Sequence, residues 1–315
     1  MKNIYSNIFS FNKKVLTKAI KNLKKGNVIG LPTETVYGLA GNAYIKKAIE
    51  RIYTLKNRPK FNPLIVHYSD YKQAEKDVLF NSSFFKLYNK FCPGPITFIL
   101  KKKKKSKIPS IATANLKTVA IRFPSHKVSK TVLKKINFPL AMPSANLSGG
   151  ISPTSAADVA DEFKNNIKLI IDGKNSKLGI ESTVVDLTGR PKILRKGIID
   201  AIQIKKILKI NYVKKSSYIK SPGLLSKHYS PGIPMRLNKK KCNKTYAFIT
   251  FGKKYGNKNN HFNLSKKSDL KEAASNLYKT FRIIKKKGFK KIYVVKIPNK
   301  GPGVAINDRL KRASK

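Results

Sequence analysis

The sequence predicts an α/β protein of about two domains. Its 315 residues exceed the usual length of one domain, and 41% of them are apolar, which is enough for a core in each. Short apolar runs typical of buried strands alternate with stretches whose apolar residues recur at helical spacing. This alternation breaks at 210–236, a segment rich in Pro, Gly and Ser that separates two such regions.

In the first region, helix and strand alternate from the beginning. Apolar residues from 15 to 23 recur at helical spacing, Gly26 ends that helix, and VIGLP (28–32) follows as a buried strand. A second helical stripe runs from 45 to 53, and another helix is expected after Pro153. Further strands are expected at PLIVHY (63–68), ITFIL (96–100), TVAIR (118–122), PLAMP (139–143), KLIID (168–172), TVVDL (183–187) and KILR (192–195).

The second region predicts a compact βαβ-like unit. Strands are expected at YAFITF (246–251) and KIYVVKI (291–297), a helix at 269–286 and a last helical piece at 307–312. A structureless loop as long as 210–236 is unusual inside a domain, so that segment is either a connection or a functional element. The expected division is a larger domain at 1–209, a linker or lid at 210–236 and a small domain at 237–315.

The formal net charge of +53 allows two interpretations. Lys and Arg could neutralise RNA phosphates. Alternatively they form a solvated surface, because Lys is spread along the whole chain beside Asn and Ile, as an AT-rich genome would bias codons. The densest run, Lys101–Lys105, is predicted as the solvated tip of a hairpin. The spread favours the solvated surface and leaves an RNA site open.

The sequence supports no metal centre, disulfide or membrane span. Cys92 and Cys242 lie outside any C-x-x-C pair, and the four histidines are scattered too widely for a two-His helical motif. No stretch approaches the roughly 18 apolar residues of a membrane span, and residues 1–20 lack a signal-peptide apolar block. We therefore expect a cytoplasmic protein with reduced cysteines and no protein-ligated metal.

Hydroxyl residues follow the first buried strand, in LPTETVYGL (31–39). Thr33, Glu34, Thr35 and Tyr37 stand at a strand end, where such groups hold a small polar ligand or simply close a hydrogen-bonded turn. From this segment alone the hydrogen-bonded turn is the favoured alternative.

Cations gather at chain breaks. Lys56 and Arg58 stand where a helix must stop before Pro59, and this pair suits an anionic group, although Lys at a helix end also complements the helix dipole. Arg122 and Arg195 each end a predicted strand. A strand-end arginine is ordinarily a surface residue, but three arginines beside hydroxyl-rich turns favour recognition of an anionic ligand.

The segment MPSANLSGG (142–150) follows the strand PLAMP. Ser144, Asn146, Ser148 and the two glycines allow backbone N–H groups and side chains to approach a phosphate or ribose closely. The segment has neither the Walker spacing nor G-x-G-x-x-G. A nucleophilic role for Ser144 is the disfavoured alternative, because it lies in no G-x-S-x-G elbow.

Together these motifs resemble those of the YrdC-type threonylcarbamoyl-AMP synthases. PTETVYGL, K-x-R-P, S-A-N-x-S-G and ESTVVD occur in the family's order and spacing over roughly 10–205. SPGLLSKHYSP (221–231) and AINDRL (305–310) resemble the linker and extra domain of the long form. The resemblance implies a twisted mixed sheet with helices around a basic cavity, followed by a smaller Rossmann-like α/β domain.

The resemblance also implies site residues, position by position. Arg122 suits the carboxylate of threonine, whereas Met142 stands where the family commonly has Thr, so a contact there must come from backbone or apolar packing. The implied threonine residues are Thr35, His67, Arg122, Met142 and Ser182; the ATP residues are Arg58, Asn62, Thr118, Ser144, Ser152, Arg195 and Tyr229; and the catalytic residues are Lys56, Arg58, Ser144 and Asn146.

The implied reaction joins L-threonine, bicarbonate or CO2, and ATP. The amine of threonine forms a carbamate whose oxygen attacks the α-phosphate and expels pyrophosphate, so preorganised cations lower the barrier. Mg²⁺ would arrive with ATP, because no carboxylate cluster is evident nearby. The product would pass to a tRNA threonylcarbamoyltransferase complex. SPGLLSKHYSP is expected to close over the nucleotide as a lid, since an inert spacer has no reason to carry Lys227, His228 and Tyr229.

Two rival interpretations accompany this one. The high positive charge favours a non-catalytic YrdC-like protein that binds double-stranded RNA, but the intact threonine and ATP positions and the extra domain argue against it. Weak binding of tRNA or double-stranded RNA is a partner expectation that the enzyme interpretation also allows. A carbamoyltransferase of the hydrogenase-maturation type shares the YrdC-like domain, but that class needs zinc-binding C-x-x-C pairs, which this sequence lacks.

Overall fold

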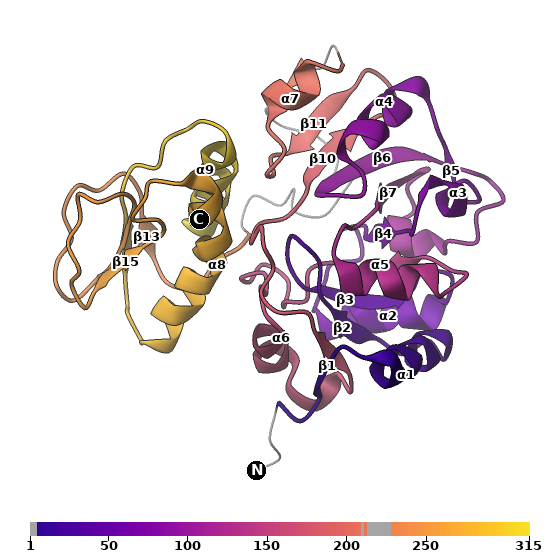
Figure 1. The fold of residues 1–315 in the computed structure, drawn as a ribbon, viewed down its shortest axis with the longest axis horizontal. Helices are drawn as coiled ribbons and strands as arrows, with labels where there is room; N and C mark the ends of the chain where they lie inside the picture. Colours follow the sequence, from indigo (N-terminus) through magenta and orange to yellow (C-terminus); the bar gives the residue numbers. More distant parts are fainter. Residues whose placement is uncertain (1–4, 209–210, 213–227) are drawn as a thin grey trace.

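The computed structural model describes residues 5–208, 211–212 and 228–315 and arranges them around two sheets (Figure 1). The strands of the larger sheet are β1 (Ile8–Ser10), β2 (Ile29–Leu31), β3 (Gly38–Asn42), β4 (Ile65–His67), β5 (Val78–Leu79), β6 (Ile96–Lys102), β7 (Thr118–Arg122), β8 (Leu140–Ala141), β9 (Ile170–Asp172), β10 (Thr183–Asp186), β11 (Lys192–Arg195) and β12 (Asn211–Tyr212). Those of the smaller sheet are β13 (Met235–Arg236), β14 (Ala247–Thr250), β15 (His261–Asn263) and β16 (Ile292–Val294).

The larger sheet is mixed and defines the first unit. Its strand order is β1-β9-β2-β3-β8-β4-β7-β6-β10-β11-β12, with β5 beside β6. Parallel pairs such as β4–β7 alternate with antiparallel pairs such as β6–β7. The helices of this unit are α1 (Lys13–Lys24), α2 (Lys46–Leu55), α3 (Tyr71–Ala74), α4 (Ser82–Phe91), α5 (Lys127–Lys134), α6 (Ala156–Phe163) and α7 (Ala201–Lys205), with 3₁₀ segments η1 (Ser110–Thr113) and η2 (Lys164–Asn166).

The smaller sheet is all-parallel, in the order β13-β16-β14-β15, and defines the second unit. Helices α8 (Leu270–Lys286) and α9 (Pro302–Ala313) lie on the side of this sheet that faces the first unit (Figure 1). A parallel sheet requires crossover connections, and α8 supplies the one between β15 and β16. The predicted α/β class, with a mixed sheet followed by a smaller α/β unit, is confirmed.

Local chemistry explains the elements that were predicted from the sequence. Asn12 caps α1 by accepting a hydrogen bond from the backbone N of Val15 at 2.9 Å, and the helix stops just before Gly26, whose φ is +76°. In α8, Asp269 caps the first turn, accepting from Lys271 N at 2.6 Å. Both helices bury one apolar stripe against their sheet.

Some elements differ from the sequence expectation. Strand β3 was not predicted, because GLAGN contains no β-branched or aromatic residue; its pairing with β2 and β8 creates it. Helix α4 was not predicted either, since its aromatic-rich sequence has no clear helical signal apart from the Asn81 cap. Lys101 and Lys102 end β6, so only the later lysines of the expected hairpin tip lie in the turn.

The expected linker at 210–236 joins a sheet at each end. Residues 211–212 form β12 beside β11, and residues 235–236 form β13 beside β16. Of the SPGLLSKHYSP motif, residues 228–231 are described, and the remainder, with Lys227, lies outside the described residues.

The two units share part of a hydrophobic core. The cluster built on the smaller sheet and α8 also contains Val36, Ile151 and Ile180, which belong to the first unit. Tyr229 is buried in the same cluster. The second unit therefore packs on the segments that carry the PTETV and S-A-N-x-S-G motifs.

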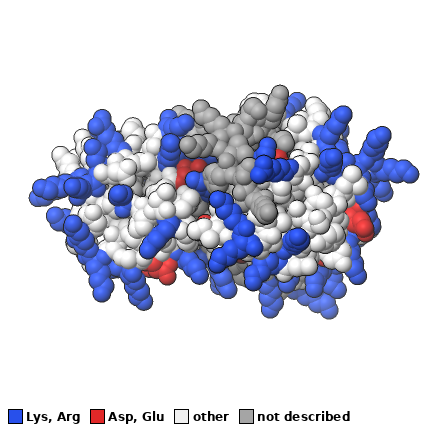
Figure 2. All heavy atoms as spheres, turned by 90° about the horizontal axis from the view of Figure 1, so that it is seen from above, with Lys and Arg blue, Asp and Glu red and all other residues white. Residues whose placement is uncertain are grey.

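Positive charge covers the molecule broadly. Figure 2 shows Lys and Arg side chains at both ends and along the rest of the described part of this face, with few acidic groups among them. This spread matches the sequence, in which Lys is distributed along the whole chain. Within the described residues, no helix is both long and apolar enough to span a membrane.

Candidate active site

A cavity lies at an edge of the larger sheet where several strands end. His67 ends β4, Arg122 ends β7, and the two parallel strands place these residues opposite each other in register. Arg195 ends β11, and Glu181 precedes β10. The cavity is lined by Thr33, Val36, Tyr37, Gly38, Arg58, Ile65, His67, Arg122, Met142, Pro143, Ser144, Glu181, Arg195, His228 and Tyr229.

The turn between β2 and β3 is held by its own hydroxyl groups. Thr33 Oγ1 accepts from the backbone N of Thr35 and of Val36, each at 3.2 Å, and donates to Val36 O at 2.6 Å. The hydroxyl oxygens of Thr33 and Thr35 lie 2.9 Å apart. The motif therefore does form a hydrogen-bonded turn, and Thr33 lines the cavity whereas Thr35 lies behind it.

Arg122 forms a buried ion pair with Glu34 of the same chain. Its Nη2 donates to Glu34 Oε1 at 2.7 Å, and the two residues are only 4% and 6% exposed. Burial alone would raise the pKa of Glu34, but the charge and hydrogen bond of Arg122, together with the backbone N–H groups of Glu34 and Ser125, lower that pKa. Arg122 Nε is buried and has no hydrogen-bond partner among the described residues, so this arginine retains a donor for a further anion.

His67 and Met142 complete the wall beside Arg122. Burial, followed by the charge of Arg122, holds the pKa of His67 well below its usual value, so its imidazole is neutral. Met142 is 3% exposed and packs so tightly on Gly38 that a Cβ there would lie 2.2 Å from Met142 Cγ. Met142 therefore offers an apolar surface, as the sequence comparison with the family implied.

Lys56 and Arg58 are both buried, yet they occupy different places. The ammonium of Lys56 donates to the carbonyl oxygens of Ser144 and Asn146, so it lies behind the loop and does not line the cavity. Arg58 lines the cavity and is held by Nε and Nη2 donating to Asn62 O at 2.9 Å and Pro63 O at 2.8 Å. Burial lowers the pKa of Arg58 to about 10, which leaves it positively charged at neutral pH.

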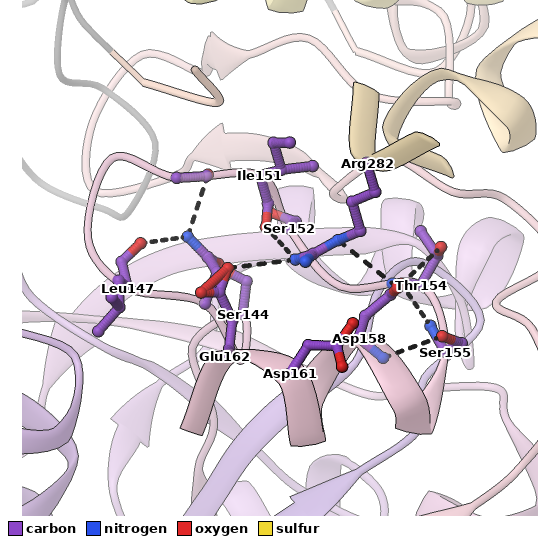
Figure 3. A network of polar contacts seen from close by, with 12 residues as sticks. Ser144, Leu147, Ile151, Ser152, Thr154, Ser155, Asp158, Asp161, Glu162 and Arg282 are labelled. Atoms are coloured by element: carbon purple, nitrogen blue, oxygen red, sulfur yellow. Dashed lines mark hydrogen bonds and ion pairs between the residues drawn. The ribbon is translucent and has the colours of Figure 1, made fainter. Parts of the chain in front are cut away.

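The loop after β8 presents Ser144 to the cavity and is braced at its far end. Asn146 Nδ2 donates to Leu147 O at 2.6 Å and to Gly150 O at 3.1 Å, while its Oδ1 has no partner within the described part of the chain. Arg282 of α8 donates to Ile151 O at 2.7 Å (Figure 3). The second unit therefore contacts the loop directly.

Arg282 is itself held by acidic residues of α6. Its Nη2 lies 3.3 Å from Glu162 Oε1, and its Nε lies 3.7 Å from Asp158 Oδ1 (Figure 3). Asp158 also forms a capping box with Ser155 at the start of α6. This network fixes the position of α6 and α8 relative to the loop.

On the other side of the cavity, Arg195 is tied to the ESTVVD segment. Its Nε donates to Ser182 O and its Nη2 to Ser182 Oγ, both at 3.0 Å. Glu181 lines the cavity and accepts a hydrogen bond from Ser152 Oγ at 2.5 Å. Ser152 and Ser182 are fully buried behind these two charged groups and orient them.

His228 and Tyr229 cover the cavity. Both line it, and Ser230 N donates to Gly149 O at 3.0 Å, which anchors this segment on the loop. The cavity volume open to the centre of a water molecule is about 40 Å³. That volume suits a few waters and is smaller than a nucleotide.

The predicted site residues fall into three groups according to their position relative to the cavity. One group lines the cavity: Arg58, His67, Arg122, Met142, Ser144, Arg195 and Tyr229. A second group lies behind its walls: Thr35, Lys56, Asn62, Asn146, Ser152 and Ser182. Thr118 stands apart, because it begins β7 opposite Lys101 while Arg122 ends that strand.

Sequence reasoning missed the partners of the arginines. Glu34 pairs with Arg122 and Glu181 with Arg309, across 88 and 128 residues of sequence. The glutamate of ESTVVD stands next to the predicted Ser182 and was the one local signal for Glu181. The sequence offered no signal for Arg309 as its partner.

Comparison with known proteins assigns both units. A family model described as "Telomere recombination", that of the Sua5/YciO/YrdC proteins, matches residues 21–197, and one described as "Threonylcarbamoyl-AMP synthase, C-terminal domain" matches 199–315. The threonylcarbamoyl-AMP synthase of Pyrococcus abyssi is 35% identical over 93% of this chain and 92% of its own. That of Bacillus subtilis is 33% identical over 97% and 94%. The crystal structure of P. abyssi Sua5 complexed with L-threonine matches with a TM-score of 0.90 at 32% identity, covering 98% of this chain and 97% of that one.

The fold and the arginine-lined cavity define an α/β protein whose strand ends form a cavity suited to small anionic ligands. The chain belongs to the Sua5/YciO/YrdC family, in the form that carries the threonylcarbamoyl-AMP synthase C-terminal domain. It is an enzyme of the nucleotidyltransferase type, and the resemblance inferred from its motifs is confirmed.

Proposed function

We propose that this chain makes L-threonylcarbamoyl-AMP and pyrophosphate from L-threonine, bicarbonate or CO2, and ATP. The observation that carries the proposal is the set of three arginines in one small cavity: Arg58, Arg122 and Arg195 are 7%, 4% and 3% exposed. Each substrate brings negative charge, as a carboxylate, a bicarbonate or a triphosphate. Charges preorganised in a buried site act more strongly than the same charges in water.

The threonine end of the cavity is built around Arg122. The unpartnered Nε of Arg122 suits the carboxylate of threonine, and the side chains of Val36 and Met142 offer an apolar surface for its methyl group. The nearby imidazole of His67 is neutral and adds no charge that would compete for the carboxylate. Thr35 supports this end through the hydroxyl of Thr33.

The ATP end is built around Arg58 and Arg195. Their guanidinium groups suit the phosphates, on which charge accumulates as pyrophosphate leaves. Ser144 and Tyr229 line the same cavity, and the hydroxyl of Tyr229 has no hydrogen-bond partner among the described residues. Lys56 contributes by holding the Ser144–Asn146 backbone in place.

Mg²⁺ enters this scheme as part of the nucleotide substrate. Glu34 and Glu181 are the carboxylates that line or adjoin the cavity, and both are already engaged by arginines. The described residues contain no group of three or more side chains suited to hold a metal ion. The phosphates and water would therefore carry most of the coordination.

The proposed place of the reaction is the cytoplasm, with the product passed to a tRNA threonylcarbamoyltransferase complex. The mixed anhydride is labile, so closure of His228 and Tyr229 over the cavity would protect it from water. The rest of the expected lid, 221–227, lies outside the described residues. Weak binding of tRNA or double-stranded RNA by the basic surface is the second candidate function, favoured by the charge of +53.

The test is an incubation of the full chain with ATP, Mg²⁺, bicarbonate and labelled threonine. We expect pyrophosphate and a threonylcarbamoyl adenylate, each dependent on threonine and bicarbonate. Mobility-shift measurements with tRNA and double-stranded RNA run in parallel. RNA binding without any adenylate would overturn the proposal in favour of the RNA-binding function.

A further inference from the structure

A buried arginine of the second unit reaches the wall of the cavity. Arg309, in α9, is 0% exposed, although its side chain is among the most polar in the protein. Its Nε donates to Glu181 Oε2 at 2.9 Å, and its Nη1 lies 2.8 Å from Asp308 Oδ2. Burying a guanidinium is costly unless a charged partner compensates it, so this placement requires an explanation.

Glu181 is the charged partner of Arg309, and through it the second unit contacts the wall of the cavity. The carboxylate lines the cavity and receives three side chains: Arg309, Ser152 and Tyr278. The hydroxyl of Tyr278 lies 3.1 and 3.0 Å from the two carboxylate oxygens. Two of these three donors come from the second unit, from α8 and α9.

The same two residues hold Tyr229. The guanidinium carbon of Arg309 lies 4.9 Å from the centre of the Tyr229 ring, and the Tyr278 ring stacks on it at 5.9 Å with an interplanar angle of 25°. Tyr229 is 0% exposed and lines the cavity. Its ring is therefore fixed from the second unit, while its hydroxyl stays without a protein partner among the described residues.

Docking of the two units does not by itself require this arrangement. Arg282 already binds Ile151 O, Glu162 and Asp158, and Lys286 lies 2.8 Å from Asp161 Oδ2, all on α6 or the loop before it. None of these side chains lines the cavity, and Figure 3 shows the contacts of Arg282. Arg309 is different, because its carboxylate partner and its aromatic partner both face the ligand space.

We propose that Arg309 and Tyr278 are positioning residues for the ATP end of the site, acting through Glu181 and Tyr229. The second unit thereby completes the nucleotide end, whereas Glu34, His67 and Arg122 of the threonine end all belong to the first unit. This inference rests on the proposed function and deepens it. Arg309 of α9 and Tyr278 of α8 form a contiguous set of buried contacts with two residues that line the cavity, Glu181 and Tyr229.

The experiment measures the Michaelis constants of ATP and threonine separately, with pyrophosphate release by the full chain as the readout. The variants are Arg309→Lys, the charge-neutral double variant Glu181→Gln with Arg309→Met, and Tyr278→Phe. Tyr278→Phe keeps the ring that stacks on Tyr229 and removes only the hydroxyl bonded to Glu181. Lys286→Met is the matched control, because it removes an ion pair between the same two units far from the cavity.

We expect Arg309→Lys and the double variant to raise the KM for ATP by about tenfold or more, and Tyr278→Phe by about threefold, with the KM for threonine changed less than about twofold. Lys286→Met is expected to behave as the wild type. A merely structural role would lower the melting temperature and the active fraction without separating the two Michaelis constants.

Equal effects on both substrates, or an ATP KM in all three variants matching that of Lys286→Met, overturn the inference. If the Arg309 variants show no cooperative melting by circular dichroism, the inference is tested on Tyr278→Phe alone, by whether its KM for ATP rises more than its KM for threonine. Absence of adenylate in the wild type would instead contradict the proposed function, so the two failures are distinguishable.

Discussion

Two buried carboxylate–guanidinium pairs flank the cavity, and they are assembled in different ways. Glu34 and Arg122 both belong to the first unit, where the turn after β2 meets the end of β7 at 2.7 Å. Glu181 belongs to the first unit, but Arg309 reaches it at 2.9 Å from the second. The first pair is complete once the large sheet has folded, whereas the second requires the two units to dock.

This difference teaches how the site is divided between the units. The proposed threonine end has its charged and ionisable groups at strand ends that lie in register, such as His67 and Arg122, and only its apolar wall at Val36 also packs against the second unit. The proposed ATP end includes Tyr229, whose ring contacts Tyr278 of α8 and Arg309 of α9. Changes to the second unit should therefore affect ATP before they affect threonine.

The largest effect should follow from deleting the chain from Ser221 onward, which removes Tyr229, Tyr278 and Arg309 together. We expect adenylate formation to fall by about a hundredfold or more, while residues 1–220 still fold and still bind threonine. Activity is measured by pyrophosphate release, folding by circular dichroism and threonine binding by calorimetry.

The deletion also exposes Val36, Ile151 and Ile180, which pack against the second unit in the intact chain. Loss of solubility is therefore checked before activity is compared. A truncated chain that makes the adenylate at the full-length rate would show that the comparison between the two ends is wrong.

The threonine end is tested by changing the amino acid. Serine lacks only the methyl group for which we propose Val36 and Met142 as the apolar surface, and one methyl in an apolar pocket discriminates by about 10- to 200-fold. We expect kcat/KM for serine to be lower than kcat/KM for threonine by a factor in that range. The KM for ATP should stay unchanged, because other residues form the proposed ATP end. Equal use of glycine and threonine would count against a threonine pocket at Arg122.

Much of the site could be predicted from the sequence because its residues follow strands. Arg122 and Arg195 were placed at the ends of apolar runs, and both line the cavity. The hydroxyl turn at Thr33 and the loop at Ser144 were located in the same way, since a polar segment after a buried strand must lie at the sheet edge.

The rest depends on contacts between distant parts of the chain. Strand β3 has little strand propensity, so pairing with β2 and β8 decides its structure. Lys56 was predicted beside the reacting phosphate, but its burial under the carbonyl oxygens of Ser144 and Asn146 depends on how the loop folds over α2. The partners of the arginines are likewise set by tertiary structure.

A smaller effect is expected from Arg58→Ala at the ATP end. Loss of this guanidinium should lower turnover by about tenfold or more, because it faces charge that develops on the phosphates. Arg190→Ala, at an exposed position, is the control and should leave turnover as in the wild type. Wild-type turnover in Arg58→Ala, with the fold intact by circular dichroism, would refute this assignment.

The smallest effect concerns the dependence of stability on pH at the ATP end. Burial, opposed by Glu181 and reinforced by Arg58, Lys56 and Arg195, lowers the pKa of His228 to about 3. The unfolded chain has a His pKa near 6.5. Between these values the unfolded state binds a proton that the folded state does not, so stability falls as the pH falls through this window.

His228→Gln should remove the part of the pH dependence of stability that comes from His228. Glu181 acts only at lower pH, because Arg309 and Arg195 overcome the opposing effect of burial and lower its pKa to about 2 from an unfolded value of 4.5. Between about pH 6.5 and pH 4.5 the difference between the variant and the wild type therefore reports on His228.

We expect the melting temperature of the wild type to fall more between about pH 7.5 and pH 5 than that of His228→Gln, by about 3 °C or more. His261→Gln, in the second unit away from the cavity, serves as the control and should follow the wild type. If His228→Gln loses as much stability as the wild type over this interval, burial in the cavity wall does not hold His228 neutral in the folded protein.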